Sequence, residues 1–320
     1  NSKEWRFKDS TYGMEFPDVS ESEKEVRSMY PTIEDIRKIA AKGQYKRVPV
    51  YREVYADRYT PVEVMRTLRK ASRHCYLLES ASQTEVWGRY SFLGYEPVME
   101  ITCTDGYMKI RHTEVGNDEG VTKQVAHPGD TLREILKEYK SPVMEEMPPF
   151  TGGLVGYFSY DYIKYSEPKL KLGEHEDPDF RDMDLMLFDQ VIAFDHYRQK
   201  VLLITGVMLD DLEKSYQKAE KKLQEMADLI RDGEKEEFPS LKLASEIKPQ
   251  FPKEKYCDMV EKAKHYIHEG DIFQVVLSNP MRAKAEGSLF DTYRVLRATN
   301  PSPYMFYFSS DDIEIVGASP

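Results

Sequence analysis

The sequence predicts an α+β protein built on antiparallel sheets. Strand-like segments are mixed with amphipathic helical segments, and they do not follow the strict strand-helix-strand order that a parallel sheet requires. The dipeptide Asp105-Gly106 separates two apolar runs, which indicates a hairpin of antiparallel strands. With 320 residues, of which 40% are hydrophobic, the chain can bury one large core or two ordinary ones.

The first half of the chain contains three helix signals and several short strands. Residues 33–42 follow Thr32, which can cap a helix, and residues 61–71 follow Thr60, which begins a capping box. A third helix is expected over 132–139, because its apolar residues fall on one side. Strands are expected over residues 48–55, 76–78, 90–93, 99–103 and 107–110.

The second half begins with strands and leads into the longest helix. Strands are expected over 154–160, 185–194 and 200–208, and the repeat of apolar residues over 211–232 predicts an amphipathic surface helix. Helices are then expected over 253–269 and 289–298, the second capped by Ser288, and strands over 273–277, 304–308 and 313–316.

The domain organisation follows from changes in composition. Residues 1–30 show no sustained periodicity and are interpreted as an N-terminal extension without assigned function. Residues 233–252 are charged and punctuated by proline, which predicts a linker. The expected domains are therefore 31–232 and 253–320.

Composition excludes several classes of function. The formal net charge of −11 argues against binding to nucleic acid or anionic lipid, because phosphates need clustered Lys and Arg. No apolar run is long enough to span a membrane. Cys75, Cys103 and Cys257 lie far apart, which predicts neither a disulfide framework nor a zinc site and favours a reduced, cytoplasmic setting.

Two motifs are better explained by structure than by ligand binding. His265 and His268 lie at helical spacing, but no third metal ligand follows, so they are interpreted as surface histidines. The glycines at 152, 153 and 156 precede a strand rather than a helix, so no helix dipole is there to receive a phosphate. Close backbone packing or a turn is the predicted role of these glycines.

Three segments are candidates for a functional site. Residues 77–80, with sequence LLES, end a strand in a carboxylate and a hydroxyl that could bind an amino acid, or could simply form a strand end. Residues 300–305, NPSPYM, form either a rigid turn or a ligand-binding backbone. Residues 270–278, GDIFQVVLS, place Gln274 in an apolar strand, where it needs partners from the core or from a substrate.

Together these segments resemble the large subunit (component I) of anthranilate synthase, within the chorismate-binding enzymes. The resemblance rests on LLES, GRYSFLG, GGLVGYFSYD, DLMLFDQVIAFDH, GDIFQVVLS and NPSPYMFYF, in this order, and covers roughly residues 32–320. It implies two antiparallel sheets packed face to face with helices outside, an N-terminal regulatory domain, and a chorismate-binding domain that begins at 253. The chain is expected to be truncated at its C-terminus, so this fold is incomplete.

The resemblance also implies the chemistry. Ammonia, supplied by a glutamine amidotransferase subunit, adds to chorismate, and loss of pyruvate leaves anthranilate; Mg²⁺ held by carboxylates binds the substrate. Isochorismate and salicylate synthases carry a Lys where Gln274 stands, so Gln274, expected in the wall of the active site, favours amination. The Lys that distinguishes aminodeoxychorismate synthase lies beyond Pro320, so that enzyme remains an alternative.

Feedback by L-tryptophan is a further implication of the resemblance. The residues it assigns to the inhibitor site are Glu79, Ser80, Pro303, Tyr304 and Met305. The family's metal ligands, catalytic His and chorismate-binding Gly-Thr and Arg belong to sequence after Pro320, so we expect no metal bound to this chain and no activity of the chain alone. A second alternative is that the isolated chain is a tryptophan-binding regulatory module.

Overall fold

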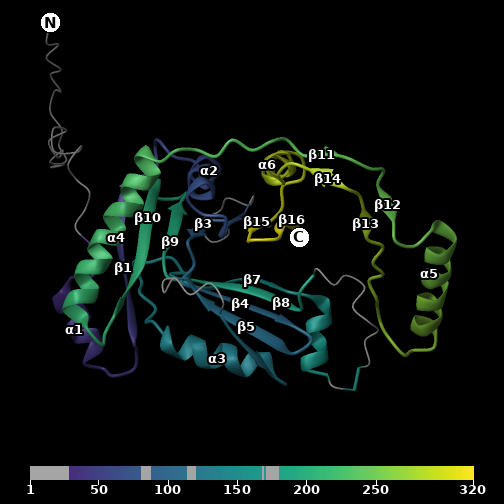
Figure 1. Ribbon diagram of the computed structural model, residues 1–320, viewed down its shortest axis with the longest axis horizontal. Helices are drawn as coiled ribbons and strands as arrows, with labels where there is room; N and C mark the ends of the chain where they lie inside the picture. Colours follow the sequence, from purple (N-terminus) through teal and green to yellow (C-terminus); the bar gives the residue numbers. More distant parts are fainter. Residues whose placement is uncertain (1–28, 81–87, 114–119, 168, 171–179) are drawn as a thin grey trace, which may run out of the picture. The chain divides into compact units, whose positions relative to one another are not determined.

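A computed structural model describes residues 29–80, 88–113, 120–167, 169–170 and 180–320 of the chain (Figure 1). The described part contains both helices and antiparallel sheets, which confirms the α+β class. The described residues form two compact units, one within 29–59 and 98–232 and the other within 60–97 and 233–320. The predicted extension 1–30 lies almost wholly outside the described residues. Across the described ranges, none of the helices has the length and apolar character needed to cross a membrane.

Unit 1 contains an antiparallel group of three strands covered by a long helix. Strand β1 (Arg47–Tyr55) pairs along its full length with β10 (Lys200–Met208), which pairs in turn with β9 (Val191–Asp195). Helix α4 (Leu212–Asp232) lies along β10 (Figure 1) and buries the residues expected from its apolar repeat, among them Ala219, Leu223, Met226 and Ile230. The predicted amphipathic helix is therefore confirmed.

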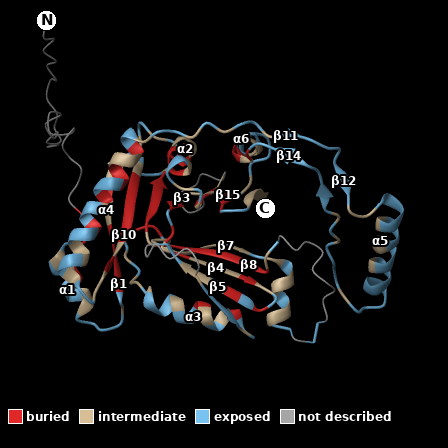
Figure 2. Ribbon diagram, viewed as in Figure 1, coloured by how far each residue is buried: buried red, intermediate tan, exposed pale blue. Residues whose placement is uncertain are grey.

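A five-stranded antiparallel sheet forms the rest of the unit 1 core. Its order is β6-β5-β4-β8-β7. The bounds are β4 (Met99–Thr104), β5 (Tyr107–His112), β6 (Val121–Gln124), β7 (Gly153–Phe158) and β8 (Met183–Phe188), followed in chain order after β7 by the short 3-10 helix η2 (Tyr160–Tyr165). Helix α3 (Pro128–Glu138) buries Leu132 against the apolar side chains of this sheet, and Figure 2 colours much of β8 as buried. This helix begins four residues earlier than predicted, with Pro128 in its first turn.

The local turn and cap signals of the sequence are confirmed. Asp105 and Gly106 have φ of 49° and 80°, and they join β4 to β5 as a hairpin. Helix α1 (Ile33–Ala40) is capped by Thr32, whose Oγ1 accepts a hydrogen bond from the Asp35 backbone N–H at 3.3 Å. Thr60 caps α2 (Pro61–Ala71) in the same way at 3.2 Å, as the capping-box pattern predicts.

The single strand predicted over 185–194 is wrong. Residues 183–188 and 191–195 form separate strands, β8 and β9, which pair with different neighbours. The break falls at Asp189, whose carboxylate accepts a hydrogen bond from Arg47 Nε at 2.5 Å. The polar residues Asp189 and Gln190 interrupt the apolar pattern at this break. Because every residue of both flanking strands is buried, the pattern still does not reveal that the pairing partner changes there.

The glycine cluster has the predicted packing role. A Cβ on Gly156 in β7 would overlap the backbone carbonyl of Asp184 on the neighbouring strand β8. Only glycine leaves room for this close approach of two backbones. His265 and His268 are exposed on their helix, as predicted.

Unit 2 is built on four antiparallel strands in the order β3-β2-β15-β16. Their bounds are β2 (Cys75–Glu79), β3 (Tyr90–Tyr95), β15 (Tyr304–Ser309) and β16 (Glu314–Ser319). Helices α2 and α6 (Phe290–Thr299) pack on these strands and bury, among others, Met65, Leu68, Phe290 and Tyr293. The predicted hairpin at the end of the chain, β15 and β16, is confirmed.

The remaining segment of unit 2 differs from prediction in two respects: it contains two short ladders that were not predicted, and it lacks one predicted strand. Helix α5 (Lys253–His268) forms as expected and is flanked by two short ladders, β11 (Lys242–Leu243) with β14 (Ala285–Glu286) and β12 (Lys248–Pro249) with β13 (Met281–Arg282). The strand predicted over 273–277 is wrong, because these residues pair with no described strand and Phe273 and Val276 are fully or nearly fully exposed. A strand needs a neighbour for its backbone hydrogen bonds, and apolar alternation alone does not supply one.

The cap predicted for the helix over 289–298 is only partly right. Ser288 Oγ accepts a hydrogen bond from the Phe290 N–H at 3.1 Å, but it lies one residue before the cap position, which Leu289 occupies. The Glu314 carboxylate, supplied by β16, accepts from the Leu289 N–H at 3.0 Å. A cap that comes from a distant strand has no local sequence signal.

The compact units divide the chain differently from the predicted domains in one segment. Residues 60–97, expected in the domain 31–232, belong to the unit formed by 233–320. The reason is the antiparallel pairing of β2 with β15, which joins residues more than two hundred positions apart. The end of unit 1 at Asp232 coincides with the predicted start of the linker.

Candidate functional site

The LLES and NPSPYM segments lie on adjacent strands of unit 2. Strand β2 pairs antiparallel with β15, and the register places Met305 opposite Glu79. One residue further along, Ser80 lies at the level of Tyr304. The two segments that the sequence analysis assigned to one inhibitor site are therefore brought together by the sheet.

The pleat of the sheet divides the five assigned residues between two faces. Successive side chains of a strand point to opposite faces, and directly paired residues share a face. Glu79 and Met305 consequently share the face that α6 covers, and both are buried, Met305 with only 2% of its surface exposed. Ser80 and Tyr304 lie on the opposite face, where Tyr304 is 57% exposed.

Aromatic side chains surround Ser80 on its face of the sheet. In the register of β2 with β3, Leu78 is paired with Phe92. Two residues further along, on the same face of the sheet, this register places Ser80 beside Tyr90. On the other side, β15 contributes Tyr304 and Phe306 to this face. We call this surface the Ser80 face and define it by Leu78, Ser80, Tyr90, Phe92, Tyr304 and Phe306.

Two further contacts shape the Ser80 face. Phe306 lies over Gly317 of β16, where a Cβ would overlap its ring. At the other side of the face, the Arg89 guanidinium lies 4.8 Å from the ring centroid of Tyr90, which itself lies 5.8 Å from that of Phe92. A hydroxyl, aromatic rings and a cation suit an aromatic ligand with a charged end.

The turn that enters β15 is held by its own hydroxyl. Ser302 Oγ donates to the Ser319 carbonyl and accepts from the Tyr304 N–H at 3.4 Å. This fixes the turn that contains Pro303, which is exposed and directly precedes Tyr304 of the Ser80 face. The proline-rich turn is thus ordered by the hairpin that it begins.

The Glu79 carboxylate is fully engaged by two side chains of α6. Its Oε2 accepts from Tyr293 Oη at 2.6 Å and from Arg297 Nε at 2.8 Å, and its Oε1 accepts from Arg297 Nη2 at 2.9 Å. Burial, and then the charge of Glu79, raise the pKa of Tyr293, so its hydroxyl stays protonated and donates. Glu79 therefore faces helix α6 and not the Ser80 face.

Gln274 does not join these residues. It lies in the irregular segment between α5 and β13, with its side chain exposed, and none of the contacts of the Ser80 face involves it. Its expected role in an active-site wall remains a prediction.

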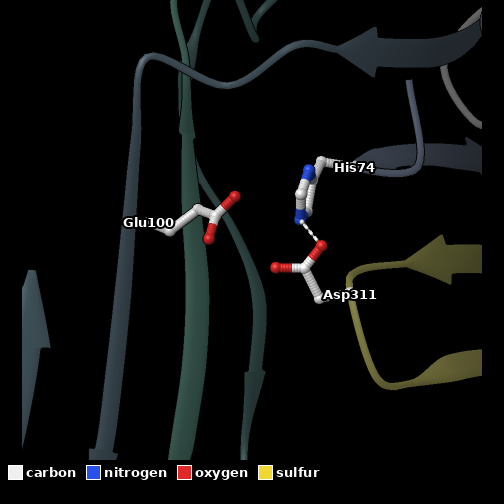
Figure 3. Close-up of side chains that lie close together, drawn as sticks. All are labelled: His74, Glu100 and Asp311. Carbon is white, nitrogen blue, oxygen red and sulfur yellow. Dashed lines mark ion pairs between the residues drawn. The ribbon is translucent and has the colours of Figure 1, made fainter. Parts of the chain in front are cut away.

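Two side chains of unit 2 that are of types able to bind a metal ion form an ion pair with each other. His74 Nε2 lies 3.1 Å from Asp311 Oδ1 (Figure 3). Glu100, which the figure also labels, belongs to unit 1, where its carboxylate is bound by Arg111 of the neighbouring strand. Mg²⁺ prefers about six oxygen ligands. One imidazole and one carboxylate that are already bound to each other do not match that preference.

Tyr90 and Phe92, which the structure brings to the Ser80 face, were not predicted from the sequence. Both belong to the GRYSFLG motif, and their spacing of two residues places them on one face of a strand. That spacing was available as a signal, but only the pairing of β3 with β2 shows that their face is the one that carries Ser80.

Comparison with known proteins agrees with this fold. The crystal structure of anthranilate synthase component I from Streptococcus pneumoniae is similar, with a TM-score of 0.58 and 32% identity over 75% of this chain and 52% of that one. Anthranilate synthase component 1 from Acetivibrio thermocellus is 33% identical over 91% of this chain and 59% of its own length. The corresponding protein from Aquifex aeolicus is 34% identical over 90% of this chain and 58% of its own. The chain thus spans less than two thirds of these relatives.

By fold, the chain is an α+β protein of the class to which anthranilate synthase component I belongs. The sequence profile of the chorismate binding enzymes matches residues 73–320. The chain belongs to the chorismate-binding enzyme family.

Proposed function

We propose that the protein acts as the large subunit of anthranilate synthase, converting chorismate and ammonia to anthranilate and pyruvate in tryptophan biosynthesis. The observation that carries the proposal is the similarity to anthranilate synthase component 1 from several organisms, at 32–34% identity over about nine tenths of this chain. Family membership alone supports only a chorismate-utilising enzyme.

Gln274 supports amination over hydroxylation of chorismate. Related enzymes that add water to chorismate use a Lys at this position, and an amide cannot remove a proton from water. The same residue does not distinguish anthranilate synthase from aminodeoxychorismate synthase, which remains the second candidate. Product analysis with full-length protein, chorismate and ammonium separates them, because only the first enzyme releases pyruvate and anthranilate.

The proposal includes partners and a setting. A glutamine amidotransferase subunit supplies ammonia, and Mg²⁺ binds the substrate through carboxylates that the resemblance assigns to sequence after Pro320. The 320 residues by themselves are accordingly proposed to be inactive, and the enzyme to work in the cytoplasm without nucleic acid or membrane. Anthranilate formed by this chain alone, well above a heat-denatured control, would contradict the first of these statements.

We further propose that L-tryptophan inhibits the enzyme by binding at the Ser80 face. Support comes from the register of β2 and β15, which places Ser80 between Tyr90 and Tyr304. The serine hydroxyl can bond a charged group of the amino acid, while aromatic rings receive the indole. If the isolated chain binds tryptophan and not chorismate, it acts as a regulatory module only.

The test is Ser80→Ala in the full-length protein. A hydrogen bond to a charged group contributes about 1.5 to 3 kcal/mol, so inhibition by tryptophan should weaken by roughly tenfold to a hundredfold. Chorismate kinetics should change little. Ser245→Ala is the matched control, since Ser245 is exposed in the same unit and bonds only backbone groups. Superimposable inhibition curves for wild type and Ser80→Ala would end the proposal of a regulatory site here.

A further inference from the structure

Glu79 joins two segments that are far apart in sequence but flank the same surface. Strand β2 ends at Glu79, and Ser80 follows it directly. Helix α6, which binds the Glu79 carboxylate, ends at Thr299, four residues before Pro303 and five before Tyr304. The Glu79 carboxylate therefore links the end of β2, next to Ser80, to helix α6, which precedes the proline turn.

The geometry of this tie is specific. Tyr293 and Arg297 are four residues apart, so they project from the same side of α6. Arg297 binds both carboxylate oxygens, and Tyr293 adds a third hydrogen bond to the oxygen that also accepts from Nε. Two parallel N–H···O bonds fix the orientation of the guanidinium relative to the carboxylate as well as the distance between them. The Glu79 side chain is only 4% exposed, whereas that of Arg297 is 42% exposed, so solvent reaches the pair from the guanidinium side alone.

The carboxylate of Glu79 points away from the Ser80 face. Adjacent residues of a strand point to opposite faces, and Glu79 points to α6. Its effect on Ser80 is transmitted through the backbone, because a fixed Glu79 fixes the direction in which the next side chain leaves the sheet.

We infer that Tyr293 and Arg297 are positioning residues for the tryptophan site, acting through Glu79 to hold Ser80 and the Pro303 turn in register. We call these three residues the Glu79 latch. The inference rests on the proposed inhibitor site and assigns Glu79 to the framework of that site, not to its ligand contacts.

The experiment measures tryptophan binding by calorimetry in full-length protein, beside thermal stability. Arg297→Ala and Tyr293→Phe should each raise the dissociation constant, by about tenfold for Arg297→Ala, which corresponds to 1.4 kcal/mol. Arg297→Lys should recover part of the loss because a single ion pair remains possible. The matched control is Arg294→Ala on the same helix, since Arg294 pairs with Asp291 at 2.8 Å on the exposed side and should leave binding unchanged.

A double-mutant cycle separates positioning from direct contact. If Glu79 acts only through the latch, Glu79→Gln and Arg297→Ala should be strongly non-additive, the double variant binding about as weakly as either single variant. If Glu79 touched the ammonium group, Glu79→Gln should cost affinity for L-tryptophan while sparing indole-3-propionate, which lacks that group. The latch instead lowers affinity for both ligands by the same factor.

The outcomes are distinguishable. Failure of the unmodified protein to bind tryptophan would overturn the proposed inhibitor site and the latch with it. Binding by the wild type, together with unchanged affinity in folded Arg297→Ala and Tyr293→Phe, would overturn the latch alone. A loss of thermal stability without loss of affinity would show a purely structural tie and would also reject the inference.

Discussion

The guanidinium of Arg47 lies 3% exposed in unit 1 and links segments that are distant in sequence. It donates to the Asp189 side chain at 2.5 Å, to the Asp189 carbonyl at 3.0 Å, to Ser141 Oγ at 3.0 Å and to the Thr151 carbonyl at 3.3 Å. These contacts hold the turn between β8 and β9 against the start of β1 and the loop before β7. Removing one partner of such a buried pair leaves polar groups without compensation.

We expect Arg47→Met to lower the free energy of unfolding by about 3 kcal/mol, the lower end of the cost of breaking a buried ion pair, because the Asp189 side chain is 27% exposed. The control is Arg37→Met, because Arg37 pairs with Glu213 at 2.8 Å on an exposed surface. Exposed pairs contribute little, so the control should unfold almost as the wild type does. Urea denaturation of both variants measures the difference, and equal midpoints would show that the Arg47 contacts do not stabilise the fold.

Residue types together with a family resemblance led to part of the candidate site. Ser80 and the NPSPYM turn were selected from their chemistry and a family resemblance, and the register of β2 with β15 brings them together. The direction of Glu79 could not be predicted in this way, because its partners Tyr293 and Arg297 follow it by more than two hundred residues. A carboxylate at a strand end has the same local sequence whether it meets a ligand or a helix.

Among the elements, the turn and the caps with local signals form as predicted, whereas one predicted strand has no described partner strand. The caps at Thr32 and Thr60 and the hairpin at Asp105-Gly106 depend on groups within a few residues, and all three form. The expected strand over 273–277 depends on a neighbour, and it is irregular. Periodicity reports which side of a segment is apolar, but strand formation also requires a second backbone to bond.

The close approach of β7 and β8 gives a prediction about one element. A Cβ at Gly156 would meet the backbone carbonyl of Asp184, which cannot move without breaking the ladder. Gly156→Ala should therefore destabilise unit 1 by about 3 kcal/mol, from overlap and backbone strain together. Gly43→Ala is the control: Gly43 has φ of 65° with open space around it, so only conformational strain of about 1 kcal/mol applies. Equal losses in chemical denaturation would argue against the backbone overlap.

At the scale of the whole molecule, the two compact units follow the composition of the chain only in part. Unit 1 ends with α4 at Asp232, where the charged segment begins and the composition changes. Residues 60–97 belong to the other unit, but no change of composition indicates this, because the sequences of α2, β2 and β3 resemble those of the elements of unit 1. Their membership is decided by the pairing of β2 with β15, which is a property of the folded chain.

Tyrosines that are buried in unit 2 and partly buried in unit 1 make stability depend on pH. Burial raises the pKa of Tyr76 and Tyr293 in unit 2, and burial with the adjacent Asp182 carboxylate raises that of Tyr165 in unit 1. Tyrosine in an unfolded chain ionises near 10.0. Above that pH the unfolded state loses protons that the folded state keeps, so the free energy of unfolding falls as pH rises.

We therefore expect the contribution of these tyrosines to the free energy of unfolding to be fully present below about pH 10 and to decline above it. The melting temperature, followed from about pH 8 to about pH 11, should fall in the upper part of this range. Phenolate absorbance of the buried tyrosines should appear only with unfolding. Tyr76→Phe keeps the ring but removes one ionising group, so its decline should be shallower than that of the wild type. A melting temperature that stays constant to about pH 11, or phenolate formation by all tyrosines before unfolding, would contradict the burial of these hydroxyls.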